Sequence, residues 1–160
     1  MNEEEQLTED NFFETDELYK IAALVNETIS SVVYHYWVNK SHGQRFEVLD
    51  WITLNFNSGN HMWLTAGEES DGIKLLEADI PALKNKLESE FKGVVTLESK
   101  DVSGHKIWKP VLGKPITPSL IQVGDKALND TLVLKFEGAD SIEISLGIEG
   151  LEVEFFEEDI

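Results

Sequence analysis

Apolar and polar residues alternate along this chain in two similar patterns that lie eighty residues apart. Residues 52–56 read Ile-Thr-Leu-Asn-Phe, and residues 132–136 read Leu-Val-Leu-Lys-Phe. Residues 62–67 correspond to 142–147 at the same offset, and residues 72–75 correspond to 150–153 after a slip of two residues. A period of two is typical of a strand that buries one face. The pattern therefore predicts two related three-stranded meanders.

A different periodicity predicts two helices. Apolar residues share one helical face after Thr15, which begins a sequence with capping-box chemistry, and we expect a helix at about 15–27. Asp79 and Pro81 are typical of a helix start, and Gly93 of a helix end, so a second helix is expected between them. The expected strands are, in chain order, 29–38, 46–56, 62–66, 72–77, 94–99, 119–123, 131–137, 141–146 and 150–156.

These elements predict an α+β fold of mainly antiparallel sheet, made of two related three-stranded meanders. One helix lies near the N-terminus and one between the meanders. We expect residues 1–14 to form an acidic, largely disordered tail and residues 15–160 a single domain, with pseudo-repeat halves at about 28–99 and 106–157. The glycine- and proline-rich bridge at 100–118 is the one candidate boundary. Three strands and a helix are only marginally stable alone, so a core shared by both halves is the expectation.

Strand parity places three glutamates on one outer sheet surface. Setting Phe136 opposite Ile142 keeps every apolar residue of the second meander on the buried side. Glu143, Glu152 and Glu154 then face outward, with Lys135 opposite Glu143. Like charges across a ladder are destabilising. Such a surface is explained either as a solvated face that discourages edge pairing or as a binding face for a basic partner.

The distribution of charge along the chain also favours a basic partner. The formal net charge is -18, and the acids are concentrated at the two ends. Residues 1–17 hold eight acids and residues 136–160 hold nine, with no base in either segment. A field of this kind repels nucleic-acid phosphates and anionic membranes and attracts basic partners. The alternative is that the acidic ends serve only solubility.

Several classes of chemistry are excluded or unsupported. The absence of cysteine excludes disulfides and thiolate metal sites. The acidic start does not resemble a secretory signal, so a cytoplasmic location is the expectation. Arg45 is the only arginine, which disfavours nucleic-acid binding. No nucleotide, hydrolase or zinc-protease motif is present, so no cofactor is expected and nothing indicates an enzyme.

Two local constellations remain as candidate sites. His35 lies in an aromatic strand, and pairing with Asp50 near Trp63 would give a small-molecule pocket, although a structural histidine is the favoured interpretation. The loop 67–72 is bounded by glycines and carries three acids, but its glycine spacing does not fit a calcium-binding EF-hand. We interpret it as an exposed hairpin loop that could contribute to partner binding. Its three acids are Glu68, Glu69 and Asp71.

The function that these observations favour is non-catalytic binding of a basic protein. In size, acidity and β content the chain is similar to bacterial immunity proteins, which neutralise basic nuclease toxins; no sequence motif carries this similarity. The first alternative is a small-molecule-binding protein or enzyme that uses the His35 region. The second is an oligomeric scaffold that pairs through the last strand, 150–156, although the glutamates there favour a monomer or weak dimer.

Overall fold

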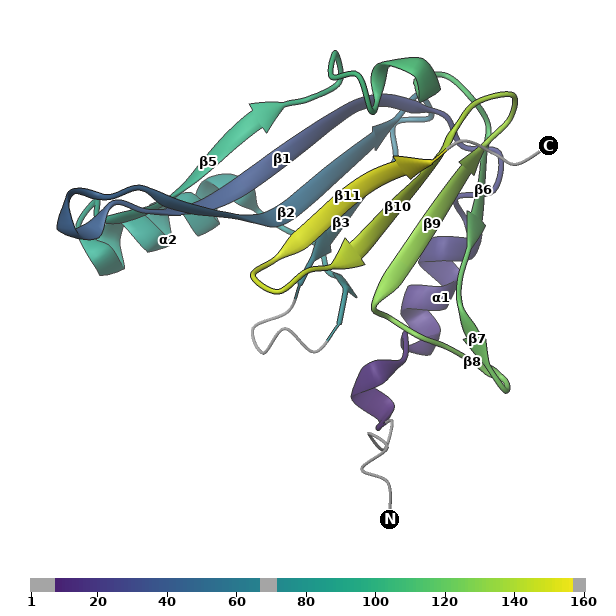
Figure 1. Ribbon diagram of the computed structural model, residues 1–160, viewed down its shortest axis with the longest axis horizontal. Helices are drawn as coiled ribbons and strands as arrows, with labels where there is room; N and C mark the ends of the chain where they lie inside the picture. The colour runs from purple at the N-terminus through teal and green to yellow at the C-terminus, as the bar shows by residue number, and fades with distance from the viewer. Residues whose placement is uncertain (1–7, 67–71, 157–160) are drawn as a thin grey trace.

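Two antiparallel sheets pack around one apolar core (Figure 1). The computed structural model describes residues 8–66 and 72–156. One sheet has the strand order β4-β3-β2-β1-β5, the other has the order β11-β10-β9-β6, and β7 and β8 form a small ribbon. The strands are β1 (Ile29–Asn39), β2 (Phe46–Phe56), β3 (His61–Thr65), β4 (Lys74–Leu75), β5 (Val95–Asp101), β6 (Ile116–Ser119), β7 (Gln122–Val123), β8 (Lys126–Ala127), β9 (Thr131–Phe136), β10 (Ser141–Leu146) and β11 (Leu151–Phe156). The helices are α1 (Thr15–Ala22) and α2 (Ile80–Phe91), with 3-10 turns η1 (Glu9–Asn11), η2 (Ser41–Gly43) and η3 (Lys109–Val111).

The α+β fold class and both helix positions are confirmed. α1 ends at Ala22, earlier than expected, and the chain continues in turns to Asn26, whose φ of 67° is left-handed. α2 begins as predicted, because the Asp79 side chain accepts a hydrogen bond from the Ala82 amide at 3.1 Å. No helix in the described ranges is both long and apolar enough to cross a membrane.

The core is built from the inward faces of both sheets. β2 and β3 contribute Ile52, Leu54 and Leu64, and β9 and β10 contribute residues of the same alternating type, all with no exposed surface. α1 adds Ile21 to the same cluster. Burying a side chain of this size contributes about 1.5–3 kcal/mol. The inward residues of the second sheet are Leu132, Leu134, Ile142 and Ile144.

The linker between the sheets closes this core with a buried tryptophan. Trp108 has no exposed surface, and its indole Nε1–H donates to the hydroxyl oxygen of Tyr34 on β1 at 2.6 Å. Burial raises the pKa of Tyr34 to about 12, so the hydroxyl stays neutral at physiological pH. The bridge at 100–118 is therefore anchored to the five-stranded sheet.

Helix α1 covers the free edge of the five-stranded sheet. Two of its side chains bond the backbone of Leu75 on the short edge strand β4. Glu17 Oε2 accepts from the Leu75 amide at 2.8 Å, and Lys20 Nζ donates to the Leu75 carbonyl at 3.2 Å. Glu17 is itself buried and also accepts from the Glu14 amide. These side chains take the place of another strand and prevent edge-to-edge association there.

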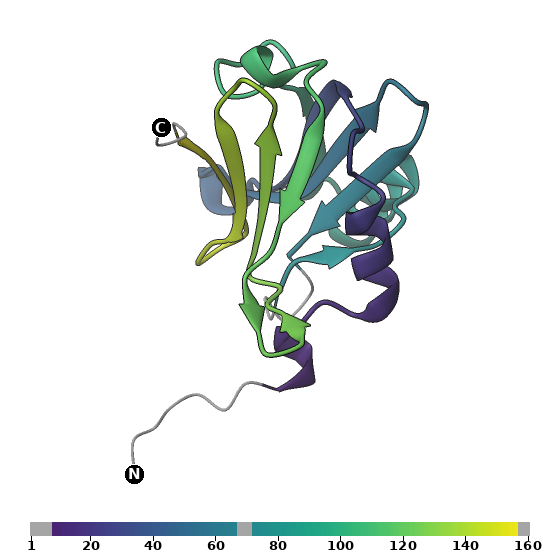
Figure 2. The ribbon, with the colours of Figure 1, turned by 90° about the vertical axis from the view of Figure 1, so that its right-hand side faces the viewer.

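The two sheets differ in length. β1 and β2 have eleven residues each, about 36 Å, whereas β9, β10 and β11 have six residues, about 20 Å. The ends of β1, β2 and β5 consequently project beyond the four-stranded sheet, with α2 packed beside β5 at that end (Figure 1). Both helices lie toward the five-stranded sheet, and no helix of the described chain covers the outer face of the four-stranded one (Figure 2).

The sheets meet closely at one corner, where the β10–β11 turn contacts β2. A side chain added at Gly150 would place its Cβ 2.7 Å from the carbonyl oxygen of Leu49 and would also clash with Val48. Only glycine permits this approach of two backbones. The corner fixes the position of the β10–β11 hairpin relative to the first sheet.

The predicted register of β9 against β10 is wrong by two residues. Ile142 pairs with Leu134 rather than with Phe136, and Glu143 consequently lies opposite Val133 rather than Lys135. The reason is a tight turn around Gly138, which has a φ of 71°. A two-residue shift keeps every side chain on its expected face. The predicted β10–β11 register is confirmed, including the pair Glu143–Glu154.

The expected tail, residues 1–14, is only partly described. Residues 1–7 lie outside the described ranges. Phe13 is buried, and its amide donates to the Ala127 carbonyl at 3.0 Å. The buried Asn129 side chain donates to the Asp10 carbonyl at 2.8 Å. These contacts hold the segment from residue 10 onward against the body.

The Trp108–Tyr34 bond generates a stability prediction. Tyr34→Phe removes the acceptor and leaves a buried indole N–H without a partner, which should lower the free energy of unfolding by about 1–3 kcal/mol in urea titrations. Tyr36→Phe is the matched control, because Tyr36 lies on the same strand and its hydroxyl has no hydrogen bond within the described structure; it should change stability by less than about 0.5 kcal/mol. Equal effects of the two variants would contradict a specific role for this bond.

Candidate functional site

The outer face of the four-stranded sheet carries the three predicted glutamates. Glu143 on β10 pairs directly with Glu154 on β11, and Glu152 lies opposite Ser145. Glu152 and Glu154 are exposed and Glu143 is half-buried. Within the described residues none of the three forms an ion pair, and Lys135 pairs across the ladder with Thr117 instead. We call this surface the acidic face.

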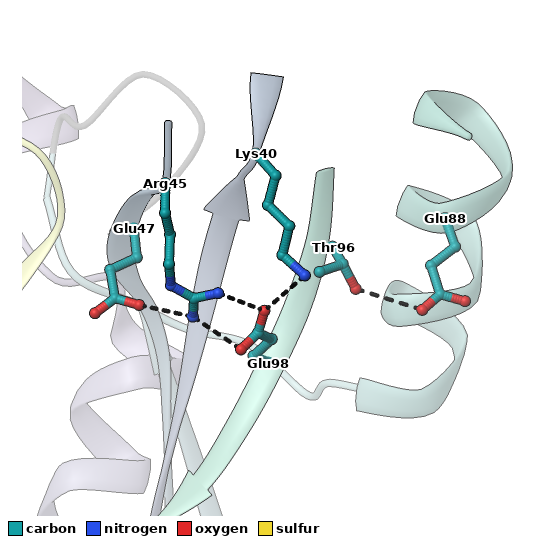
Figure 3. Close-up of polar contacts among 6 residues, drawn as sticks. All are labelled: Lys40, Arg45, Glu47, Glu88, Thr96 and Glu98. Atoms are coloured by element: carbon teal, nitrogen blue, oxygen red, sulfur yellow. Dashed lines mark hydrogen bonds and ion pairs between the residues drawn. The ribbon is translucent and has the colours of Figure 1, made fainter. Parts of the chain in front are cut away.

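The projecting end of the five-stranded sheet shows the opposite arrangement. Arg45 contacts both carboxylate oxygens of Glu98, at 2.9 and 3.2 Å, and Glu47 at 3.0 Å (Figure 3). Lys40 lies 3.5 Å from Glu98. Bonding to Arg45 lowers the pKa of the Glu98 carboxyl and raises that of the guanidinium. Lys40 and Arg45 thus form ion pairs with Glu47 and Glu98 here, whereas no ion pair neutralises the three glutamates of the acidic face in the described residues.

His35 is a structural residue inside the five-stranded sheet. Its ring is 4% exposed, and its nitrogens are hydrogen-bonded to Ser99 at 2.6 Å and to Thr53 at 2.7 Å. The predicted partnership with Asp50 is wrong, because these two hydroxyls occupy both ring nitrogens. Burial lowers the pKa of His35 to about 4, so the ring is neutral at physiological pH.

Asp50 and Trp63, the other two residues of the expected pocket, share neither a hydrogen bond nor a cavity with the His35 ring in the described structure. Asp50 lies at a register irregularity between β1 and β2, and burial raises the pKa of its carboxyl. Trp63 is half-buried on β3 and lines a cavity whose lining includes neither His35 nor Asp50. The residues expected to form one pocket thus have three different surroundings.

The cavity beside Trp63 has a volume of about 220 Å³ and lies between α1 and the β2–β3 hairpin. His61 and Trp63 form one wall, with their ring centroids 5.7 Å apart. Sequence reasoning missed Lys20, Glu27 and His61 in this place. Helical periodicity could not have found this set, because α1 ends at Ala22 and Glu27 follows the left-handed Asn26. Nothing local indicated which strand would face them.

The remaining predicted partner-binding residues, Glu68, Glu69 and Asp71, lie outside the described residues. Among the residues that are described, no group of three or more His, Asp or Glu side chains is arranged to hold a metal ion. The described chemistry of the molecule is therefore that of the acidic face and of several hollows, of which the cavity beside Trp63 is one.

The burial of His35 predicts a pH dependence of stability. An unfolded histidine has a pKa near 6.5, so between pH 6.5 and 4 the unfolded chain binds a proton that the folded chain does not. The free energy of unfolding should fall by about 3 kcal/mol as the pH is lowered through this window, with no further loss from His35 below it. His35→Gln should remove this component. The difference in the free energy of unfolding between wild type and variant should therefore decrease by about 3 kcal/mol as the pH is lowered from 6.5 to 4.

The measurement is chemical denaturation of both proteins at several pH values. The raised pKa of Asp50 acts in the opposite direction, but equally in both proteins, and cancels in the difference. His105→Gln, which changes an exposed histidine, is the control and should keep the wild-type slope. Parallel curves for wild type and His35→Gln would show that His35 does not titrate as a buried ring.

The comparisons with known proteins leave these surfaces as the only guide to function. No protein-family model matches the chain, and no curated protein or solved structure is significantly similar to it.

Proposed function

We propose that this protein is a non-catalytic binding module that recognises a basic protein through the acidic face. The observation that carries the proposal is the direct pairing of Glu143 with Glu154 on a sheet surface that no helix of the described chain covers, with no ion pair to either carboxylate in the described residues. Like charges in register destabilise a sheet by a few tenths of a kcal/mol or more. A partner that supplies lysine or arginine would remove this repulsion on binding.

The charge distribution supports the same partner chemistry. The net charge of -18 accelerates encounter with a basic protein, and this acceleration weakens with salt. At the projecting end of the other sheet, Lys40 and Arg45 already neutralise their neighbouring glutamates. That surface therefore has less negative charge with which to attract a basic partner. Among functions of this kind, toxin neutralisation as in bacterial immunity proteins matches the size and charge of the chain.

A nuclear magnetic resonance titration with an octalysine peptide tests the proposal. At about 0.1 M salt the Debye length is about 10 Å, so only charges near the peptide contribute. Amide shifts should concentrate on β10 and β11. The variant E143Q/E152Q/E154Q should bind about tenfold more weakly, which corresponds to about 1.4 kcal/mol over three charges. It should also unfold at equal or higher denaturant concentration, because the repulsion is gone.

The matched control D16N/E90Q/D125N removes three exposed acids elsewhere and changes the net charge equally. It should retain most of the affinity. Equal weakening by both triple variants, or shifts spread evenly over the surface, would refute the acidic face as a binding site.

A further inference from the structure

The cavity beside Trp63 exists because the edge strand β4 is too short to cover β3. β4 pairs only with Leu64 and Thr65, at the end of β3. Beside the first half of β3 the neighbouring element is α1, and the space between them forms the cavity of about 220 Å³. This cavity is smaller than the roughly 300–1,000 Å³ of pockets for drug-sized ligands or cofactors. Its volume matches one side chain or a small organic molecule.

Most of the residues that line the cavity are apolar or aromatic. The His61 ring is held in place because Nδ1 is hydrogen-bonded to Asn55 Oδ1 at 2.6 Å, and the Asn55 amide nitrogen in turn donates to Ser31 at 2.9 Å. The ring is tilted 38° to that of Trp63. The remaining apolar lining is Ala23, Leu24, Phe56, Met62, Leu75 and Leu76. An apolar stem can therefore be buried beside the indole ring.

The charged groups of the lining favour a cation. Glu27 and Glu77 both line the cavity, against one ammonium group, that of Lys20. Lys20 is engaged with the Leu75 carbonyl as part of the edge cover. Glu27 is held by Ser58 and Asn60, which both donate to Oε2, at 2.9 and 3.2 Å. Glu27 and Trp63 line the same cavity, and a fixed carboxylate together with an indole ring is a favourable setting for an organic cation.

We propose that this cavity binds a guanidinium or ammonium group carried on a short apolar stem. The stem packs against Trp63 and the apolar lining, and the cation lies between the indole face and the carboxylates of Glu27 and Glu77. The acidic face belongs to the other sheet, so this site goes beyond the proposed function and stands independently of it. Either a free amine or a basic side chain of a peptide carries the required group.

The charge preference of the cavity can be tested by titrating the protein with three small probes. Binding is monitored by the nuclear magnetic resonance signals of the Trp63 indole and amide groups. The probes are butylguanidinium, its neutral isostere butylurea, and the anion pentanoate. Butylguanidinium should shift the Trp63 signals saturably, and butylurea should bind at least fivefold more weakly. Acetylarginine amide distinguishes the two sources: binding equal to that of butylguanidinium indicates a peptide side chain, and exclusion indicates a free amine.

Glu77→Gln should weaken butylguanidinium binding about fivefold without threatening the fold, because Glu77 is exposed. Glu27→Gln should weaken it similarly, and Glu90→Gln, which removes an exposed acid from α2, should not. Equal affinity for butylurea, tighter binding of pentanoate, or no saturable shift with any probe would overturn the proposal. The variant E143Q/E152Q/E154Q should leave these titrations unchanged. A negative result for the cavity can therefore be distinguished from a negative result for the acidic face.

Discussion

Burial of the alternating faces of two sheets against each other is the interaction on which the remaining structure depends. Leu54 on one sheet and Leu134 and Ile144 on the other have no exposed surface and belong to a single cluster. Because successive side chains of a strand point to opposite faces, fixing these residues inside also fixes their neighbours outside. The outward position of Glu143 and Glu154 is thus a consequence of core packing, whatever the function of the carboxylates.

The manner in which the sheet edges are closed determines where ligands have access. α1 uses Glu17 and Lys20 to bond the backbone of β4, which closes that edge without a further strand. Because β4 has only two residues, the same arrangement leaves the space beside Trp63. Closure of the edge and formation of the cavity therefore have a common structural cause, and Lys20 takes part in both.

The sequence predicted local structure well and long-range partners poorly. The alternation around Ile144 fixed the strand faces, and Asp79 marked the start of α2, since both signals lie within a few residues. The register error at β9 arose because the turn at Gly138 is tighter than the apolar pattern indicated. His35 found its partner in Ser99, 64 residues away, which no spacing rule anticipates. Of the proposed sites, the acidic face follows from parity, whereas the cavity depends on how α1 docks.

Native-state hydrogen exchange tests the shared core most directly, because it measures the opening free energy of each strand separately. If the two sheets depend on one core, the slowest amides of β2 and β9, such as those of Leu54 and Leu134, should open with the same free energy and respond equally to denaturant. Opening of the four-stranded sheet at a clearly lower free energy, with the five-stranded sheet still protected, would show two independent units and contradict the account.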